Sequence, residues 1–136
     1  MKNKIFILTD YKNNFGSKWN NKPYRSGMNK NLLRKYFKKS GYNTEFVKFS
    51  DFNPDTMPEY SFLIYTSSED INYYYKDYIE DVILYAQEYG FKVIPEYKFL
   101  RANNNKVFME LLKSKIFSNK FDNLRTKAYG AFEDVN

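Results

Sequence analysis

Isolated acids are the first candidates for chemistry in this sequence. Asp10 directly follows a short apolar run, and Glu96 lies just beyond another. Either carboxylate could act as a base, but the spacing ties neither to a second carboxylate, so no acid–base pair is predicted. The sequence has no Cys and no His, which excludes thiolate nucleophiles, thiolate metal sites and histidine-based acid–base catalysis. No glycine-rich phosphate loop and no metal-spaced cluster occurs. We therefore predict no catalytic residue and no metal ligand in this chain.

A cation-rich segment is the second candidate. Residues 11–27 lack an apolar period and are rich in Asn, Lys and Gly, which predicts a long loop after the first strand. Cations and aromatic side chains alternate in this loop at Lys18, Trp19, Lys22, Tyr24 and Arg25. Such a mixture suits a small anionic molecule, and Lys18, Trp19 and Arg25 are the predicted substrate ligands. The alternative is a surface loop in which Trp19 packs locally.

Four apolar runs predict the strands that position these residues. They are residues 4–9, 44–49, 60–66 and 91–94, and helical patterns separate most of them. The order strand, helix, strand, strand, helix, strand predicts an α/β, Rossmann-like, three-layer domain with a mainly parallel sheet in the order 2-1-3-4. The link over residues 50–59 is short for a crossover helix, and a simple turn remains open.

Three helical patterns accompany the strands. The first begins near Met28, with Ser26 or Asn29 as its cap and Gly41 as its end. Its expected apolar face comprises Met28, Leu32, Leu33, Tyr36 and Phe37. The second spans residues 71–89, and its aromatic stripe is expected to pack in the core. After one turn over residues 97–100, Asn103 and Asn104 are expected to cap the third helix.

The sheet topology selects one edge for ligand binding. In open parallel sheets, ligands bind beyond the carboxyl ends of the strands, near the switch point between strands one and three. Asp10 follows the first of these strands, and Thr66, Ser67 and Ser68 follow the other. These four residues therefore join Lys18, Trp19 and Arg25 as predicted substrate-binding residues.

The net charge of +6 is concentrated in the first third of the chain. Residues 1–48 contain only Asp10 and Glu45 as acids, so this part can attract a phosphate or a carboxylate. Nucleic acid is the least favoured partner, because abundant Lys, Asn, Tyr, Phe and Ile also reflect AT-rich codons. No apolar run approaches the roughly 20 residues of a membrane span. We therefore expect a cytoplasmic protein with no membrane partner.

The segment after the fourth strand carries a resemblance to a known family. Val93-Ile94-Pro95 leads to Asn105-Lys106 and then to a helix containing Leu111-Leu112. This pattern resembles the join in ATP-grasp ligases, where the last strand of the N-terminal domain leads to an Asn-Lys or Asp-Lys pair that opens a helix. The resemblance covers residues 1–116.

This resemblance implies a role and a set of partners. Residues 1–116 would form the domain that precedes the ATP-grasp domain, and residues 117–136 would be a tail or the start of that missing domain. Lys106 would reach a nucleotide phosphate. The fragment would bind no cofactor by itself, because Mg-ATP requires the missing C-terminal domain. Its partners would be a small, anionic substrate and that domain, and a homodimer is left open.

The implied function is substrate binding and structural support in an ATP-dependent carboxylate-amine ligase, without catalysis by this piece alone. The alternative is a non-catalytic Rossmann-like module, of receiver or flavodoxin-like type, that binds a small anion or a protein partner. A receiver needs further acids beside Asp10, and the sequence provides none there.

Overall fold

The protein is described by a computed structural model that covers residues 4–16, 27–58, 61–67, 75–117 and 130. The chain divides into two compact units, residues 1–97 and residues 98–136. The predicted domain boundary between residues 116 and 117 stays a prediction.

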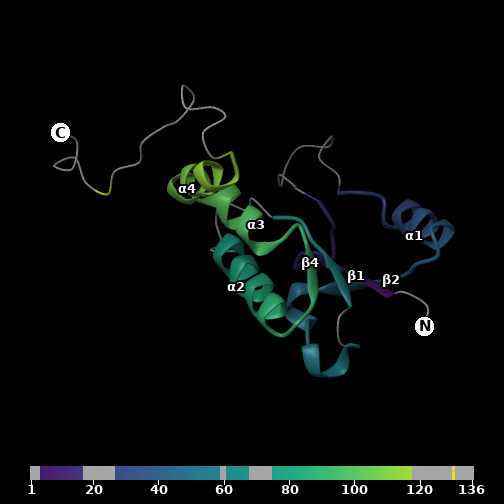
Figure 1. Cartoon of the computed structure of the whole chain (residues 1–136). Coiled ribbons are helices and arrows are strands. Elements are labelled where there is room, and N and C mark those ends of the chain that lie inside the picture. The colour runs from purple at the N-terminus through teal and green to yellow at the C-terminus, as the bar shows by residue number, and fades with distance from the viewer. Residues whose placement is uncertain (1–3, 17–26, 59–60, 68–74, 118–129, 131–136) are drawn as a thin grey trace. The chain divides into compact units, whose positions relative to one another are not determined.

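A four-stranded parallel sheet forms the centre of the first unit (Figure 1). Its strands are β1 (Lys4–Thr9), β2 (Asn43–Lys48), β3 (Phe62–Ile64) and β4 (Lys92–Ile94). The order is β2-β1-β3-β4 and every pairing is parallel, which confirms the predicted α/β class and strand order. β1 is almost fully buried, as expected for a continuous apolar run between two other strands.

Two helices cover opposite faces of this sheet (Figure 1). Leu33 and Phe37 of α1 (Lys30–Lys39) pack with Ile5 and Ile7 of β1 in one apolar cluster. Because side chains alternate along a strand, Phe6 and Leu8 point to the other face. The helix on that side is α2 (Tyr75–Glu88), whose Ile79, Ile83 and Ala86 are fully buried.

Local signals set the ends of both helices. The side chain of Asn29 accepts hydrogen bonds from the backbone N–H groups of Asn31 and Leu32, so Asn29 caps α1 as predicted. Gly41 and Gly90 have φ values of 86° and 106°, the left-handed conformation that favours glycine after a helix.

The connection between β2 and β3 is built from two short 3-10 turns, η1 (Phe49–Asp51) and η2 (Pro54–Thr56). It contains no crossover helix, as its length indicated. Phe49 was expected to be the last residue of β2, but it starts η1 and is buried. The chain therefore turns one residue earlier than the alternating pattern predicts.

Two expected apolar faces are only partly buried, which corrects the sequence prediction. Leu32 and Tyr36 of α1 are exposed, as is Met28 just before the helix, while Leu33 and Phe37 contact the core. Leu32 and Tyr36 each precede one of these core residues by one position, which turns them by about 100° around the helix axis. Tyr78 of α2 and Tyr89, the residue after this helix, are likewise exposed.

The remaining helices are α3 (Tyr97–Asn104) and α4 (Lys106–Phe117). α3 is longer than the single turn expected, and it contains both residues predicted to cap the next helix. Asn105 caps α4 instead, because its side chain accepts a hydrogen bond from the backbone N–H of Phe108 at 2.9 Å. Among the described residues, no helix has the length and apolar character needed to cross a membrane.

Candidate functional site

Asp10 organises the turn that follows β1. Its Oδ1 accepts hydrogen bonds from the backbone N–H groups of Lys12 and Asn14, at 2.9 and 2.8 Å. The backbone of Asp10 also donates to the carbonyl of Asn14, and the N–H of Asn13 donates to the carbonyl of Asp10. Only 9% of the surface of Asp10 is exposed. One oxygen of this predicted substrate ligand is therefore committed to the loop.

The turn is anchored to β2 and α1 as well. The hydroxyl of Thr9 lies 3.2 Å from Oδ1 of Asn13 and 3.3 Å from the carbonyl oxygen of Val47. Nζ of Lys30 donates to the carbonyl of Asn13 at 2.9 Å. These contacts fix the turn against two neighbouring elements, so it is a defined part of the sheet edge.

Thr66 joins the two strands at the predicted switch point. Its Oγ1 accepts a hydrogen bond from the backbone N–H of Gly16 at 3.0 Å, across 50 positions of sequence. Because β1 and β3 are parallel neighbours, the turn after β1 and the segment after β3 meet at the same edge. The structure therefore brings the predicted residues Asp10 and Thr66 to one region.

Ser67 presents an unused polar atom at the end of the same strand segment. Its Oγ is buried and has no hydrogen-bond partner in the described part of the chain. The hydroxyl of Tyr65 is also buried without a hydrogen-bond partner among the described residues. Burial and the negative charge of Glu80 raise the pKa of Tyr65. A buried hydroxyl without a partner is costly, and a ligand can supply the missing hydrogen bond.

An aromatic cluster borders Asp10, and sequence reasoning assigned its central residue only to the core. The ring of Tyr75 lies 5.3 Å from that of Tyr11, 5.6 Å from that of Tyr78 and 6.3 Å from that of Phe49, measured between centroids. Tyr11 and Tyr78 are 38% and 39% exposed. The only sequence signal for this cluster was the position of Tyr75 near the start of a helix that follows β3.

The charge of the Asp10 carboxylate affects the pKa of Tyr75. The pKa of Tyr75 is raised from an ordinary 10.0 to about 12, first by burial and then by the negative charges of Asp10 and of an ionised Tyr78. A hydrogen bond from the backbone of Tyr11 acts in the opposite direction and lowers the pKa. The neutral phenol is therefore the stable form beside Asp10.

This shift predicts a loss of stability in alkali. Above pH 10.0 the unfolded chain releases the Tyr75 proton, while the folded protein keeps it up to about pH 12. The free energy of unfolding therefore falls as the pH rises through this interval. We expect Tyr75→Phe to lose less stability than the wild type between about pH 9 and about pH 11, measured by urea unfolding. Tyr36→Phe on the exposed face of α1 is the control, and equal losses in both variants would contradict the assignment.

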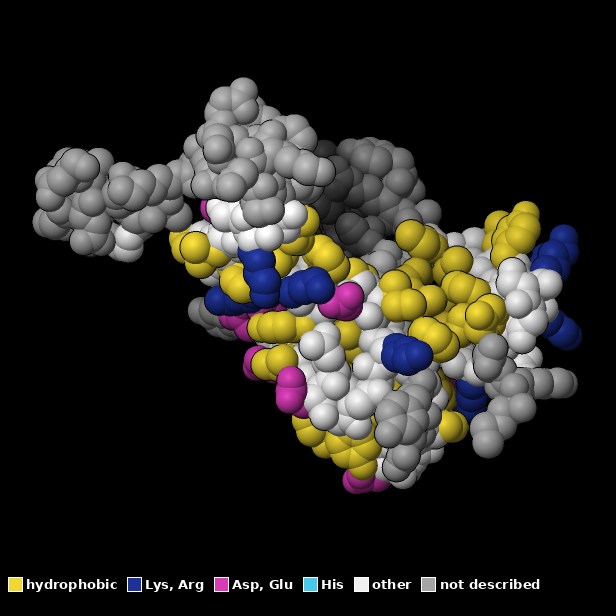
Figure 2. Space-filling model, in the orientation of Figure 1, with side chains coloured by type: hydrophobic (Ala, Val, Ile, Leu, Met, Phe, Trp, Pro, Cys, Tyr) yellow, Lys and Arg dark blue, Asp and Glu magenta, His cyan; other side chains and the backbone are white. Residues whose placement is uncertain are grey.

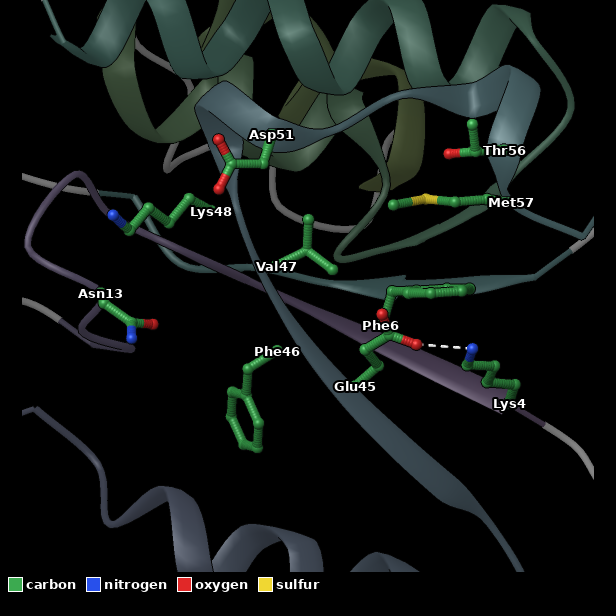
Figure 3. A pocket seen from close by; sticks show the side chains of 10 residues that line it. All are labelled: Lys4, Phe6, Asn13, Glu45, Phe46, Val47, Lys48, Asp51, Thr56 and Met57. Carbon is green, nitrogen blue, oxygen red and sulfur yellow. Dashed lines mark ion pairs between the residues drawn. The ribbon is translucent and has the colours of Figure 1, made fainter.

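A hollow of about 430 Å³ lies along β2 and reaches Asn13 in the turn after β1 (Figure 3). Phe6, Val47 and Met57 form its apolar wall, and the ion pair between Lys4 and Glu45 lies at one end. Lys48 and Asp51 lie at the other end. No sequence prediction included this hollow, because one of its walls comes from the irregular turn that carries Met57.

The other predicted site residues lie elsewhere. Lys18, Trp19, Arg25 and Ser68 fall outside the described residues. Lys106 is the first residue of α4, where it is exposed, and it belongs to the second unit. In the described parts of the chain, no group of three or more acidic side chains is placed to hold a metal ion.

Comparison with known proteins adds no family to this geometry. No family model matches the sequence, and no curated protein or solved structure is significantly similar to it. The function is therefore argued from the contacts at the edge of β1 and β3.

Proposed function

We propose that this chain binds a small anionic molecule at the carboxyl ends of β1 and β3. The observation that carries the proposal is the buried Oγ of Ser67, which has no partner among the described residues. It follows Thr66, whose side chain ties β3 to the loop after β1. Ligands in open parallel sheets bind at this kind of edge.

We propose further that the chain does so as the N-terminal domain of an ATP-grasp ligase, without catalytic activity of its own. Two features support this role. The elements follow the expected order through β4, and the next long helix opens with Asn105 as its cap and Lys106 as its first residue. An ammonium at a helix start opposes the helix dipole and gains from a bound phosphate. We place the protein in the cytoplasm, where Mg-ATP is supplied and where a chain without Cys needs no oxidising environment.

Binding at the sheet edge is tested with inorganic phosphate, citrate and L-glutamate in thermal-shift and calorimetric titrations. We expect at least one of these anions to raise the melting temperature in a saturable way. Ser67→Ala should leave the free protein as stable as the wild type, since it deletes an unsatisfied hydroxyl, yet weaken anion binding about five- to tenfold. The control is Ser40→Ala, whose exposed hydroxyl donates to the carbonyl of Tyr36 at the C-terminal end of α1, before β2 begins. No binding by any of the three anions, or equal affinity in Ser67→Ala, would refute the site.

The ligase role is tested separately on the complete product of the gene that encodes this chain. We expect Mg-ATP-dependent release of ADP when a carboxylate and an amine are both present. Lys106→Ala should raise the KM for ATP about tenfold, because it deletes one charged contact to phosphate. A product that ends at Asn136 and releases no ADP would refute the ligase role while leaving the anion site to its own test.

A further inference from the structure

The outer surface of α1 carries a line of apolar side chains that the core does not use. Met28, Leu32 and Tyr36 are 54%, 48% and 60% exposed, and we call these three residues the α1 stripe. Leu32 and Tyr36 lie four positions apart on the same side of α1, and Met28 lies two residues before the helix begins, next to its cap Asn29. No residue of α1 is fully buried, because only Leu33 and Phe37 reach the core cluster.

Basic side chains surround this stripe. The helix contains five cations and no acid, and the cations are Lys30, Arg34, Lys35, Lys38 and Lys39. Lys30 and Arg34 lie over the ring of Phe46 on the inner side, at 5.6 and 5.1 Å from its centroid. Lys35, Lys38 and Lys39 are exposed. Figure 2 shows hydrophobic and basic side chains together over α1, at the right of the view.

Helical geometry places the exposed cations directly beside the stripe. With about 100° of rotation per residue, Lys35 and Lys39 fall within about 60° of Leu32 around the helix axis. Nζ of Lys39 lies 5.6 Å from the centroid of the Tyr36 ring, within the stripe itself. The outer face of α1 is therefore apolar and cationic over the same surface.

We propose that α1 binds the surface of an anionic lipid membrane through the α1 stripe and its flanking lysines. Basic amphipathic helices bury an apolar side at the boundary of headgroups and acyl chains while their cations meet anionic headgroups. The phosphates of a nucleic acid would pair with the lysines, but they would not bury the apolar side chains of Met28 and Leu32. An anionic lipid surface provides negative headgroups for the lysines and acyl chains for the α1 stripe.

This inference revises the expectation that no membrane is involved, which rested on the absence of an apolar run long enough to span one. A helix that lies on the surface needs no such run. It also connects to the candidate site, because the backbone N–H of Met28 donates to the carbonyl of Phe15 in the loop after Asp10, at 2.6 Å. A membrane-bound α1 would hold that loop near the lipid surface.

The test is co-sedimentation of the protein with vesicles of phosphatidylcholine, with and without phosphatidylglycerol. We expect binding only when phosphatidylglycerol is present, and weaker binding as the salt concentration rises. Leu32→Asp should weaken binding at least about tenfold. It replaces an apolar side chain that lipid would bury by a negative charge that the anionic headgroups repel. The double variant Lys35→Glu, Lys39→Glu should weaken it by a similar factor.

The matched control is Leu84→Asp on α2, where a leucine of 37% exposure lies outside the basic surface. It should bind vesicles like the wild type. All substituted side chains are exposed or partly exposed, and circular dichroism checks that each variant is folded. The proposal is overturned if phosphatidylglycerol vesicles do not bind, if Leu32→Asp binds them equally well, or if duplex DNA binds more tightly than vesicles and is insensitive to Leu32→Asp.

Discussion

We expect Leu63→Ala to lower the free energy of unfolding by about 3 kcal/mol. Leu63 is fully buried at the middle of β3, in register with Phe6 of β1 and Val93 of β4. Truncation removes the apolar contacts of the side chain and leaves a cavity that flanking strands cannot close, since their spacing is fixed by backbone hydrogen bonds. Urea unfolding followed by circular dichroism measures the loss.

The same truncation at Leu84 is the control for this experiment. Leu84 is 37% exposed on α2, so Leu84→Ala should cost less than about 1 kcal/mol. The prediction is wrong if the two variants lose similar stability. That result would mean that β3 does not lie at the centre of the packed layers.

We expect Asp10→Ala to lower the free energy of unfolding by about 2 kcal/mol. The substitution removes the carboxylate oxygen that accepts hydrogen bonds from the N–H groups of Lys12 and Asn14. Water can reach part of this turn, because Lys12 is exposed, which keeps the expected cost below that of two fully buried donors. Urea unfolding gives the value, and amide hydrogen exchange locates the loss.

Asp10→Asn separates the hydrogen bonds from the charge. The amide oxygen still accepts from the backbone, so Asp10→Asn should retain more than half of the stability that Asp10→Ala loses. Hydrogen exchange should become faster at Lys12 and Asn14 in Asp10→Ala but not at Leu33 in α1. Equal stability of the wild type and Asp10→Ala would show that the turn does not depend on this carboxylate.

The strands could be predicted because each is a short apolar run bounded by turn residues. β1 was predicted with its observed bounds, and the predicted strand order placed β2 at an edge of the sheet, as observed. The capping of α1 by Asn29 was also predictable, since an Asn just before a helical pattern has a local partner in the first turn. The cap of α4 was not predictable, because three consecutive Asn residues offer the same chemistry and only the length of α3 selects Asn105.

The candidate site was predicted in part. The switch-point argument selected Asp10 and Thr66, and the structure brings the segments that carry them together through the Gly16 contact. It did not show that Asp10 would hold its own turn or that Tyr75 would lie beside it. These relations depend on side-chain directions across three elements, and spacing along one element does not encode them.

The sequence by itself determined the element types, the parallel direction of the strands and the edge at which the loop after β1 must lie. Periodicity and turn chemistry are local, so they can be read from neighbouring residues. Only the tertiary structure decided which apolar residues of α1 face the sheet. A helix can present a single side to a flat sheet, so Leu33 and Phe37 reached the core while Met28, Leu32 and Tyr36 remained exposed among lysines.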